Sequence, residues 1–226
     1  MATSPADPVR IDIVSDVVCP WCYIGWAQLR AALAAEGVAA DIRWHPFELN
    51  PAMPPEGEAV SDHLRRKYGA SPEQAAATRG AMREMAAEAG IVLGAPARIF
   101  NTRDCHRLLH WARETGRQTA LAEALFRAYF EAGSDLGTNG VLLAAVEAAG
   151  LDGQEAAEVL AGEAHAHAVE ALEARFAEMG ITGVPAMIFD ERGLVLGAQG
   201  QETYRRLIAR VAEKRAARAD TDPSAA

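Results

Sequence analysis

Two cysteines separated by two residues carry the most specific chemistry in this sequence. Cys19 and Cys22 follow a short β-branched run that ends at Val14, and they begin an apolar, helix-prone segment. The N–H groups and the partial positive charge at a helix N-terminus stabilise a thiolate. A thiolate is the attacking species in thiol–disulfide exchange. The spacing and its position therefore predict a redox-active pair.

The two cysteines are expected to have different roles. If Cys19 is the N-cap residue, Pro20 takes the first helical position, where its missing N–H has no cost. Cys22 then lies one turn further into the helix, close enough to form a disulfide. Because Cys19 is nearer the helix start, we expect it to be the nucleophile and Cys22 the resolving cysteine. Half of a zinc site and two inert core thiols are the other interpretations, but zinc usually needs a second cysteine pair or a close histidine pair.

A second group of reactive side chains lies in the middle of the chain. A single cysteine inside a helix, such as Cys105, is most often a small buried hydrophobe. The functional alternative is a third redox thiol, if the helix that carries Cys105 covers Cys19. His106 and His110 are one turn apart and could bind a metal, but no third ligand lies nearby in the sequence.

Other polar residues have a simpler interpretation. His165 and His167 are two residues apart, so they cannot face each other on a helix, and we expect both to be solvated. Trp44 and Phe47 are expected in the core. Four arginines could bind a carboxylate such as that of glutathione, or form a solvated face: Arg103, Arg107, Arg113 and Arg117.

The composition limits the function classes. Half of the 226 residues are apolar, enough for one large domain or for one domain with an insertion. The 31 acidic and 22 basic residues give a net charge of −9, and no basic run is interleaved with aromatics, so no nucleic-acid role is expected. Residues 1–10 lack the apolar part of a secretory signal, and no stretch is long enough to span a membrane. With three cysteines in all, we expect a catalytic pair in a cytoplasmic protein.

The residues around the cysteine pair indicate a β-α-β unit. Ile11–Val14 is a predicted strand, and Pro20–Glu36 is a predicted helix that ends at Gly37. Ala39–Leu49 contains the alternating apolar residues of a second strand. Two strands joined by a helix are expected to be parallel, with a right-handed crossover.

The middle of the chain changes character. Between Glu58 and Met179 we find no convincing strand, and turn signals divide this part into six or seven expected helices. Ser71 followed by Pro72 is typical of one helix start, with an N-cap residue and a proline at the first position. Glu163–Met179 is the last predicted helix of this part.

Strand character returns near the C-terminus. Thr182–Phe189 is a predicted strand with Leu194–Leu196 as a short partner, and Tyr204–Val211 is a closing amphipathic helix. The fold class is therefore α/β. We predict one domain from residues 9–57 and 163–212, an all-helical insertion over 58–162, and a disordered tail over 213–226.

Three stretches resemble the DsbA-like thioredoxin family, and within it the FrnE-type cytosolic branch. They are Asp16–Gly25, Asn101-Thr102 with His106-Arg107-Leu108, and Gly183-Val184-Pro185, in an order that matches over residues 9–212. The resemblance implies a thioredoxin fold with a large helical insertion between its N-terminal βαβ and C-terminal ββα units. It also implies disulfide chemistry at Cys19 and Cys22, a cis peptide bond before Pro185, and substrate backbone paired with the Val184 region.

Further residues are expected to tune such a site. Pro20 and Trp21 lie inside the motif, where DsbA proper has a histidine beside the proline. Because tryptophan adds no positive charge near the thiolate, we expect a less oxidising pair than in DsbA proper. Candidate accessory residues from the helical insertion are Cys105, His106 and Arg107.

The expected activity is that of a thiol–disulfide oxidoreductase or isomerase acting through a mixed disulfide on Cys19, which Cys22 resolves. Its partners are expected to be protein or small-molecule thiols and disulfides, with glutathione as a candidate co-substrate, no bound cofactor and no metal. The chain is expected to be a monomer or a homodimer. Two alternatives stay open: a glutathione-dependent isomerase or transferase on a small aromatic substrate, and a chaperone-like binding module. Isomerases and kappa-class glutathione transferases of similar fold use serine in place of Cys19, which argues against a true isomerase.

Overall fold

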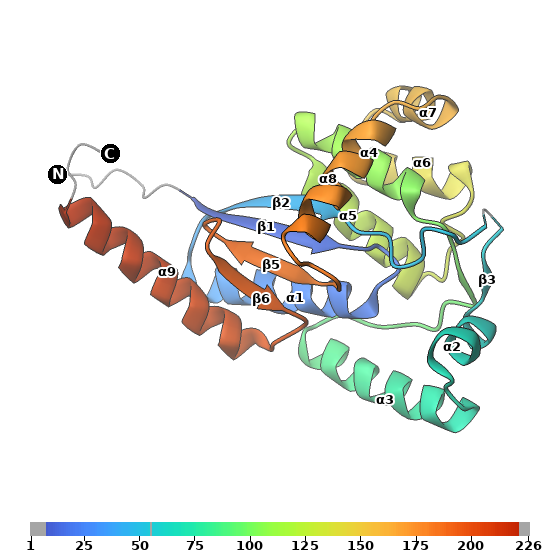
Figure 1. Ribbon diagram of the computed structural model, residues 1–226, viewed down its shortest axis with the longest axis horizontal. Helices are drawn as coiled ribbons and strands as arrows, with labels where there is room; N and C mark the ends of the chain where they lie inside the picture. Colours follow the sequence, from blue (N-terminus) through green and yellow to red (C-terminus); the bar gives the residue numbers. More distant parts are fainter. Residues whose placement is uncertain (1–7, 55, 222–226) are drawn as a thin grey trace.

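A four-stranded sheet forms the centre of the computed structural model, which describes residues 8–54 and 56–221. The strand order is β2-β1-β5-β6 (Figure 1). β1 (Val9–Ser15) and β2 (Ala40–Pro46) are parallel, and β5 (Ala186–Phe189) and β6 (Gly193–Leu196) follow in antiparallel orientation. The predicted β-α-β unit and the C-terminal strand pair are confirmed.

Helices cover both faces of this sheet. Successive side chains of a strand point to opposite faces. Ile11 and Ile13 of β1 belong to the main core, together with buried residues of α1 (Pro20–Glu36) and α9 (Gln201–Thr221). The next residue, Val14, belongs to a second, smaller cluster with Phe176 of α8 (Ala166–Glu178). Thus α1 and α9 pack on one face of the sheet and α8 on the other (Figure 1).

Helix α1, which begins with the cysteine motif, is largely enclosed by the rest of the protein. Ten of its 17 residues are buried, as expected for a helix that is apolar on most of its circumference. The ring of Tyr23 stacks on Phe126 at 5.0 Å between centroids, and Trp26 meets Trp44 edge to face at 5.2 Å. Gly37 ends the helix in the left-handed conformation (φ 62°), as predicted. The position of the motif is therefore fixed by core packing.

The middle of the chain is mainly helical. It contains, in order, α2 (Val60–Tyr68), α3 (Pro72–Glu88), α4 (Arg103–Glu114), α5 (Gln118–Phe126), the π-helix η1 (Arg127–Glu131), α6 (Asn139–Ala148) and α7 (Gly153–Ala161). Together with α8, this agrees with the predicted number of helices. Ser71 and Gln74 form a reciprocal capping box at the start of α3, which confirms that helix start.

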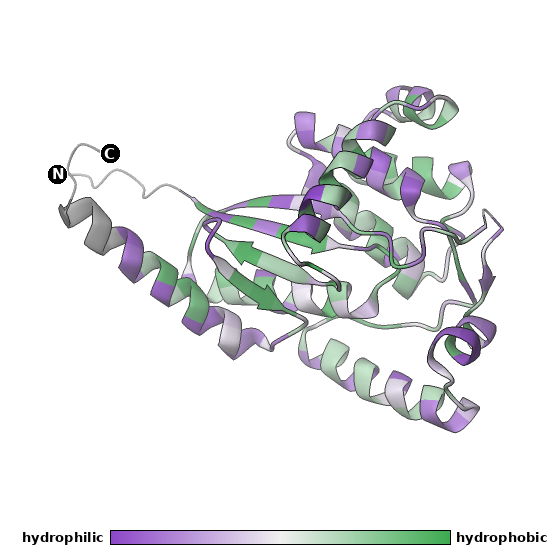
Figure 2. Ribbon diagram, in the orientation of Figure 1, coloured by the Kyte–Doolittle hydropathy of each residue, from purple (hydrophilic) through white to green (hydrophobic). Residues whose placement is uncertain are grey.

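Part of this helical segment packs directly on the sheet. α4 and α5 contact β2, and their buried residues join the same core as α1. Figure 2 shows mainly hydrophobic residues in β5 and β6, and both hydrophobic and hydrophilic residues on the helices around the sheet. The division into a domain of residues 9–57 and 163–212 and an insertion over 58–162 stays a prediction.

Two expectations about secondary structure are wrong. β3 (Glu58–Ala59) and β4 (Arg98–Ile99) form a separate antiparallel pair in the segment where no strand was expected. A two-residue strand has no periodicity from which it could be predicted. The proposed tail is also helical as far as Thr221, because α9 continues. The Arg215 guanidinium fastens α9 to Asp190 at 2.6 Å, and residues 222–226 lie outside the described residues.

Two predicted elements begin later than expected. α8 begins at Ala166 rather than at residue 163, because His165 has a left-handed backbone (φ 63°) that a helix cannot include. β5 begins at Ala186 rather than at residue 182, because the segment before it contains a cis peptide bond.

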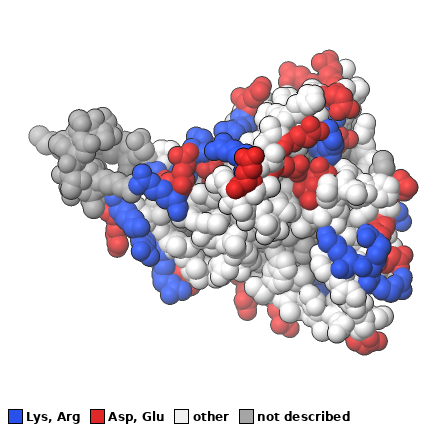
Figure 3. Space-filling model, in the orientation of Figure 1, with Lys and Arg blue, Asp and Glu red and all other residues white. Residues whose placement is uncertain are grey.

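Charged side chains of both signs share the face seen in Figure 3. Lysines and arginines gather over α2 and along α9, with acidic residues among them. Ion pairs join Arg65 to Asp62 at 2.5 Å and Arg66 to Glu58. Within the residues that the structure describes, no helix is both long and apolar enough to cross a membrane.

Candidate active site

Cys19 and Cys22 lie at the beginning of α1, directly after the turn that follows β1. Cys19 is the N-cap residue, with an extended backbone (φ −88°, ψ 113°), and Pro20 begins the helix as predicted. The N–H groups of Cys22 and Tyr23 donate to the Cys19 carbonyl oxygen at 3.1 and 3.3 Å. The Cys19 side chain makes no capping bond to the described helix backbone. Its sulfur is therefore available to the segment that faces it.

Both cysteines are unbonded thiols and both are nearly inaccessible. Cys19 is 4% exposed and Cys22 is 1% exposed. Burial raises the pKa of the Cys22 thiol well above its usual range, and the neighbouring Cys19 sulfur raises it further. Ser15 and Asp16 oppose this effect only in part. Cys22 is therefore held as a neutral thiol near neutral pH.

The segment before β5 faces the cysteine pair. The Val184–Pro185 peptide bond is cis, which confirms that prediction. The Val184 carbonyl oxygen lies 3.8 Å from the Cys19 sulfur. Helix α1 approaches this segment so closely that a Cβ atom at Gly25 would lie 3.3 Å from the Pro185 ring. Residues from the two ends of the chain thus meet around one sulfur atom.

Pro20 and Trp21 are the half-exposed residues of the motif. Trp21 also packs partly against the main core. The two residues between the cysteines are therefore the part of the motif that is open to solvent. Their influence on the redox pair stays a prediction.

Helix α4 brings His106 to the turn before Cys19. His106 is buried, and its Nε2 atom lies 3.6 Å from Oδ1 of the buried Asp16. The sequence indicates His106 as a candidate site residue, but it gives no such indication for Asp16. The signal that could have marked Asp16 is an acidic residue between an apolar strand and the apolar run Val17-Val18-Cys19.

The two neighbours of His106 have other surroundings. Cys105 is fully buried, and burial raises the pKa of its thiol, as expected for an inert core cysteine. Arg107 is also buried, but its guanidinium donates to the carbonyl oxygens of Val159, Gly162 and Ala164 and to Asp104. Most of these bonds tie the Arg107 guanidinium to the end of α7 and to the segment that connects α7 with α8. Arg107 is therefore a structural residue, and the accessory role expected for it is not supported.

The other histidine predictions have mixed outcomes. His167 is solvated as predicted, with its side chain 99% exposed. The expectation that His165 is solvated is wrong, because its Nδ1 atom lies 2.9 Å from Nδ1 of His110. Two histidines far apart in sequence meet here because the left-handed backbone at His165 turns the chain back toward α4. No group of three or more His, Cys, Asp or Glu side chains in the described part of the chain could hold a metal ion.

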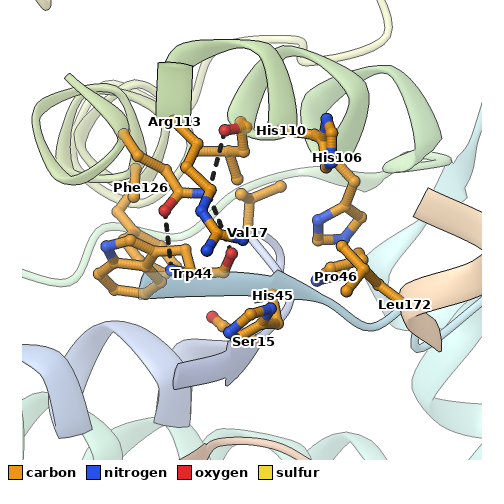
Figure 4. A pocket seen from close by; sticks show the side chains of 13 residues that line it. Ser15, Val17, Trp44, His45, Pro46, His106, His110, Arg113, Phe126 and Leu172 are labelled. Carbon is orange, nitrogen blue, oxygen red and sulfur yellow. Dashed lines mark hydrogen bonds between the residues drawn. The ribbon is translucent and has the colours of Figure 1, made fainter. Parts of the chain in front are cut away.

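A small cavity lies between α4, α5 and the end of β2 (Figure 4). His106 projects from α4 toward Pro46 and Leu172 at one side of it (Figure 4). At the other side, the Gln118 amide accepts from Trp44 N and donates to Trp44 O, each at 2.9 Å, and donates to Leu109 O at 3.0 Å. This amide therefore provides hydrogen-bond partners for the Trp44 backbone at the outer edge of β2, and it holds α5 against that strand. The predicted core position of Trp44 is confirmed.

Comparison with known proteins agrees with this arrangement. A family model described as DSBA-like thioredoxin domain matches residues 10–209. The uncharacterized protein YwbO of Bacillus subtilis (strain 168) is 26% identical over 203 residues, which are 88% of this chain and 96% of that protein.

Two solved structures are similar in fold. A probable DsbA oxidoreductase from Streptomyces coelicolor has a TM-score of 0.83 and 36% identity, with 90% of this chain and 89% of that chain covered. The cytosolic disulfide reductase DsbM from Pseudomonas aeruginosa, solved with GSH, has a TM-score of 0.63 and 19% identity, with coverage of 88% and 97%. The second likeness is one of fold alone.

Proposed function

The chain belongs to the DSBA-like thioredoxin domain family, and from this premise we propose that it is a thiol–disulfide oxidoreductase with Cys19 and Cys22 as its redox pair. The position of Cys19 supports this proposal best. It begins α1, where the helix dipole favours a thiolate, and its sulfur faces the Val184 carbonyl across the cis-proline segment. The description of the Streptomyces coelicolor protein as a probable DsbA oxidoreductase agrees with it.

The proposed reaction passes two electrons from the pair to a substrate disulfide. The Cys19 thiolate attacks one substrate sulfur, a mixed disulfide forms, and the other substrate sulfur leaves as a thiolate that takes up a proton. Cys22 then loses its proton and attacks the Cys19 sulfur. The mixed disulfide breaks, the second substrate thiol leaves, and a Cys19–Cys22 disulfide remains. The same steps in reverse oxidise a substrate dithiol.

The unequal environments of the two sulfurs give the order of these steps. Since burial raises the pKa of Cys22, this thiol stays protonated and does not compete with Cys19 for the substrate. Burial is the largest cause of the raised pKa of Cys22 and persists throughout the reaction. Once Cys19 is bonded to substrate, the charge of its sulfur no longer adds to this effect, which makes Cys22 easier to deprotonate at the step where it must attack.

A small thiol of the glutathione class is proposed as the reductant that returns the pair to its dithiol form. Two glutathione molecules would be oxidised to one glutathione disulfide for each turnover, which balances the electrons. The similar structure of DsbM, solved with GSH, favours this choice. A cytoplasmic location is proposed with it, because the cytoplasmic glutathione pool is strongly reducing.

Reduction of insulin disulfides in the presence of dithiothreitol tests the proposal. The wild-type protein is expected to accelerate the precipitation of the insulin B chain, and Cys19→Ser to abolish this acceleration. When reduced Cys22→Ser protein reacts with insulin in the absence of dithiothreitol, a mixed disulfide is expected to accumulate on Cys19, visible by mass spectrometry. Cys105→Ala is the matched control and should retain the wild-type rate, since Cys105 is a fully buried thiol outside the redox pair.

Other outcomes would favour the alternatives. Turnover of a glutathione conjugate without insulin reduction would favour an isomerase or transferase. Suppression of aggregation that is unchanged in Cys19→Ser, again without insulin reduction, would indicate a binding module. An adduct on Cys22 in the Cys19→Ser variant, with none in Cys22→Ser, would show that the two roles are reversed.

A further inference from the structure

One residue of the turn before Cys19 connects three separate parts of the molecule. The Asp16 carbonyl oxygen accepts from the Cys19 N–H at 3.0 Å, which shapes the turn itself. Its carboxylate oxygen Oδ2 accepts from the Leu49 N–H at 2.8 Å, in the loop after β2. Its other carboxylate oxygen, Oδ1, faces His106 of α4 at 3.6 Å. Asp16 is completely buried, so each of these contacts is shielded from water.

His106 is buried, and its Nε2 atom makes no hydrogen bond within the described residues. The Oδ1 atom of Asp16 lies within ion-pair distance of this Nε2 atom. The separation of 3.6 Å is that of an ion pair rather than of a hydrogen bond. The next residue, Arg107, donates to backbone carbonyls and Asp104 instead. His106 is therefore the imidazole that α4 directs to the redox turn.

The charges around His106 favour its protonated form. Burial alone lowers the pKa of His106, but the carboxylates of Asp16, Glu173 and Glu48 outweigh burial and raise it. Glu173 extends from α8 and accepts from the Glu48 N–H at 2.9 Å. Burial and Glu173 raise the pKa of Glu48 itself. Arg103 of α4 also faces Glu48, but its guanidinium is bound to Glu170 at 2.6 Å.

We propose that Asp16 and His106 form a buried ion pair that positions the turn carrying Cys19 and sets the redox equilibrium of the Cys19–Cys22 pair. Asp16 and His106 are positioning residues, since neither contacts the sulfur of Cys19. The proposal rests on the oxidoreductase function proposed above. It assigns to the helical segment a direct electrostatic effect on the thiols.

The direction of the effect follows from charge balance. With His106 protonated, the negative charge of Asp16 is neutralised beside the thiols. Without the imidazolium, the Asp16 carboxylate would keep only its hydrogen bonds from the Leu49 and Val18 N–H groups. Its net negative charge in a low-dielectric site near the cysteines would then disfavour a second negative charge there. The reduced, thiolate-bearing form would lose stability relative to the disulfide. A reduction potential is raised when the reduced form is stabilised, so loss of His106 should make the pair more reducing.

A single and a double variant of the full chain test this inference. His106→Asn is expected to shift the equilibrium constant with glutathione at least tenfold toward the disulfide, which is about 30 mV for a two-electron couple. For the double variant Asp16→Asn/His106→Asn, the equilibrium constant with glutathione is expected to lie within about threefold of the wild-type value, because both charges are then absent. His167→Asn, on the exposed face of α8, is the matched control and should have no effect.

Each result has a defined meaning. A wild-type potential in His106→Asn would overturn the inference, and so would equal shifts in the single and double variants. If His106→Asn does not fold, 15N NMR of histidine-labelled wild-type protein replaces it. The His106 ring is expected to be mostly protonated at about pH 6.5, the ordinary histidine pKa, because its own pKa is raised, and a mostly neutral ring at that pH would overturn the inference. If the wild type itself forms no Cys19–Cys22 disulfide in glutathione buffers, the proposed function fails, and the NMR result still decides whether the ion pair exists.

Discussion

The substitution Gly25→Ala separates two opposite effects of one methyl group. Alanine is favoured over glycine inside a helix by about 1 kcal/mol. At Gly25, however, the new Cβ would lie 3.3 Å from both the Pro185 ring and the Met187 methyl group, and 3.6 Å from Ala198 Cα. Forcing an extra methyl into a packed core costs about 1–3 kcal/mol. Met187 can adjust by rotation. The Pro185 ring is joined to the backbone at both ends, so it can yield only by a small change of pucker or by moving with its backbone.

The net expectation for Gly25→Ala is a protein destabilised by about 0–2 kcal/mol. Insulin reduction should slow by about three- to tenfold, since movement of Pro185 displaces Val184, which faces Cys19. Gly80→Ala in α3 is the matched control, because nothing lies within 4 Å of its Cβ position. Gly80→Ala is expected to raise the unfolding free energy by about 0.5–1 kcal/mol and to leave the activity unchanged.

Urea unfolding gives both free energies, and the insulin assay gives both rates. Because the helix-propensity gain is common to the two variants, their unfolding free energies should differ by about 1–3 kcal/mol, which is the steric term alone. Equal stabilisation of both variants, with full activity in both, would refute the view that α1 presses against the Pro185 segment.

Two further substitutions test the supports of the sheet. Gln118→Ala should lower the unfolding free energy by about 3 kcal/mol in urea, because the buried Trp44 N–H and C=O groups lose their partner and the Leu109 C=O loses a second donor. A loss no larger than that of the exposed control Gln154→Ala would contradict this. Burial raises the pKa of Asp12, but hydrogen bonds from His45 and Arg10 outweigh it, and the net shift is downward. The stability that Asp12 contributes is therefore present above its unfolded value of about 3.9 and is lost as pH falls through the lower folded value. In urea titrations from pH 7 to pH 3, the difference in unfolding free energy between wild type and Asp12→Asn should shrink below about pH 4. A difference that does not depend on pH would argue against a stabilising Asp12 carboxylate.

Local signals in the sequence were sufficient for the elements around the redox motif. The bounds of α1 are those predicted, because Pro20 and Gly37 each have one favourable place at a helix end, and both places depend only on the neighbouring backbone. The parallel pairing of β1 with β2 follows from the helix between them. The cis bond before Pro185 was predicted from resemblance to a family and not from a local signal, since most X–Pro bonds in folded proteins are trans.

Tertiary structure alone decided which polar residues meet. In the sequence, His106 and Arg107 are adjacent and equally good candidates for the site. In the fold, successive helix residues point about 100° apart, so His106 faces Asp16 while Arg107 faces the carbonyls after α7. His165 likewise meets His110 through a backbone turn that no local pattern indicates. A local pattern fixes the direction of a side chain along its own helix or strand, but its partner depends on how distant elements pack, and that packing is a property of the whole chain.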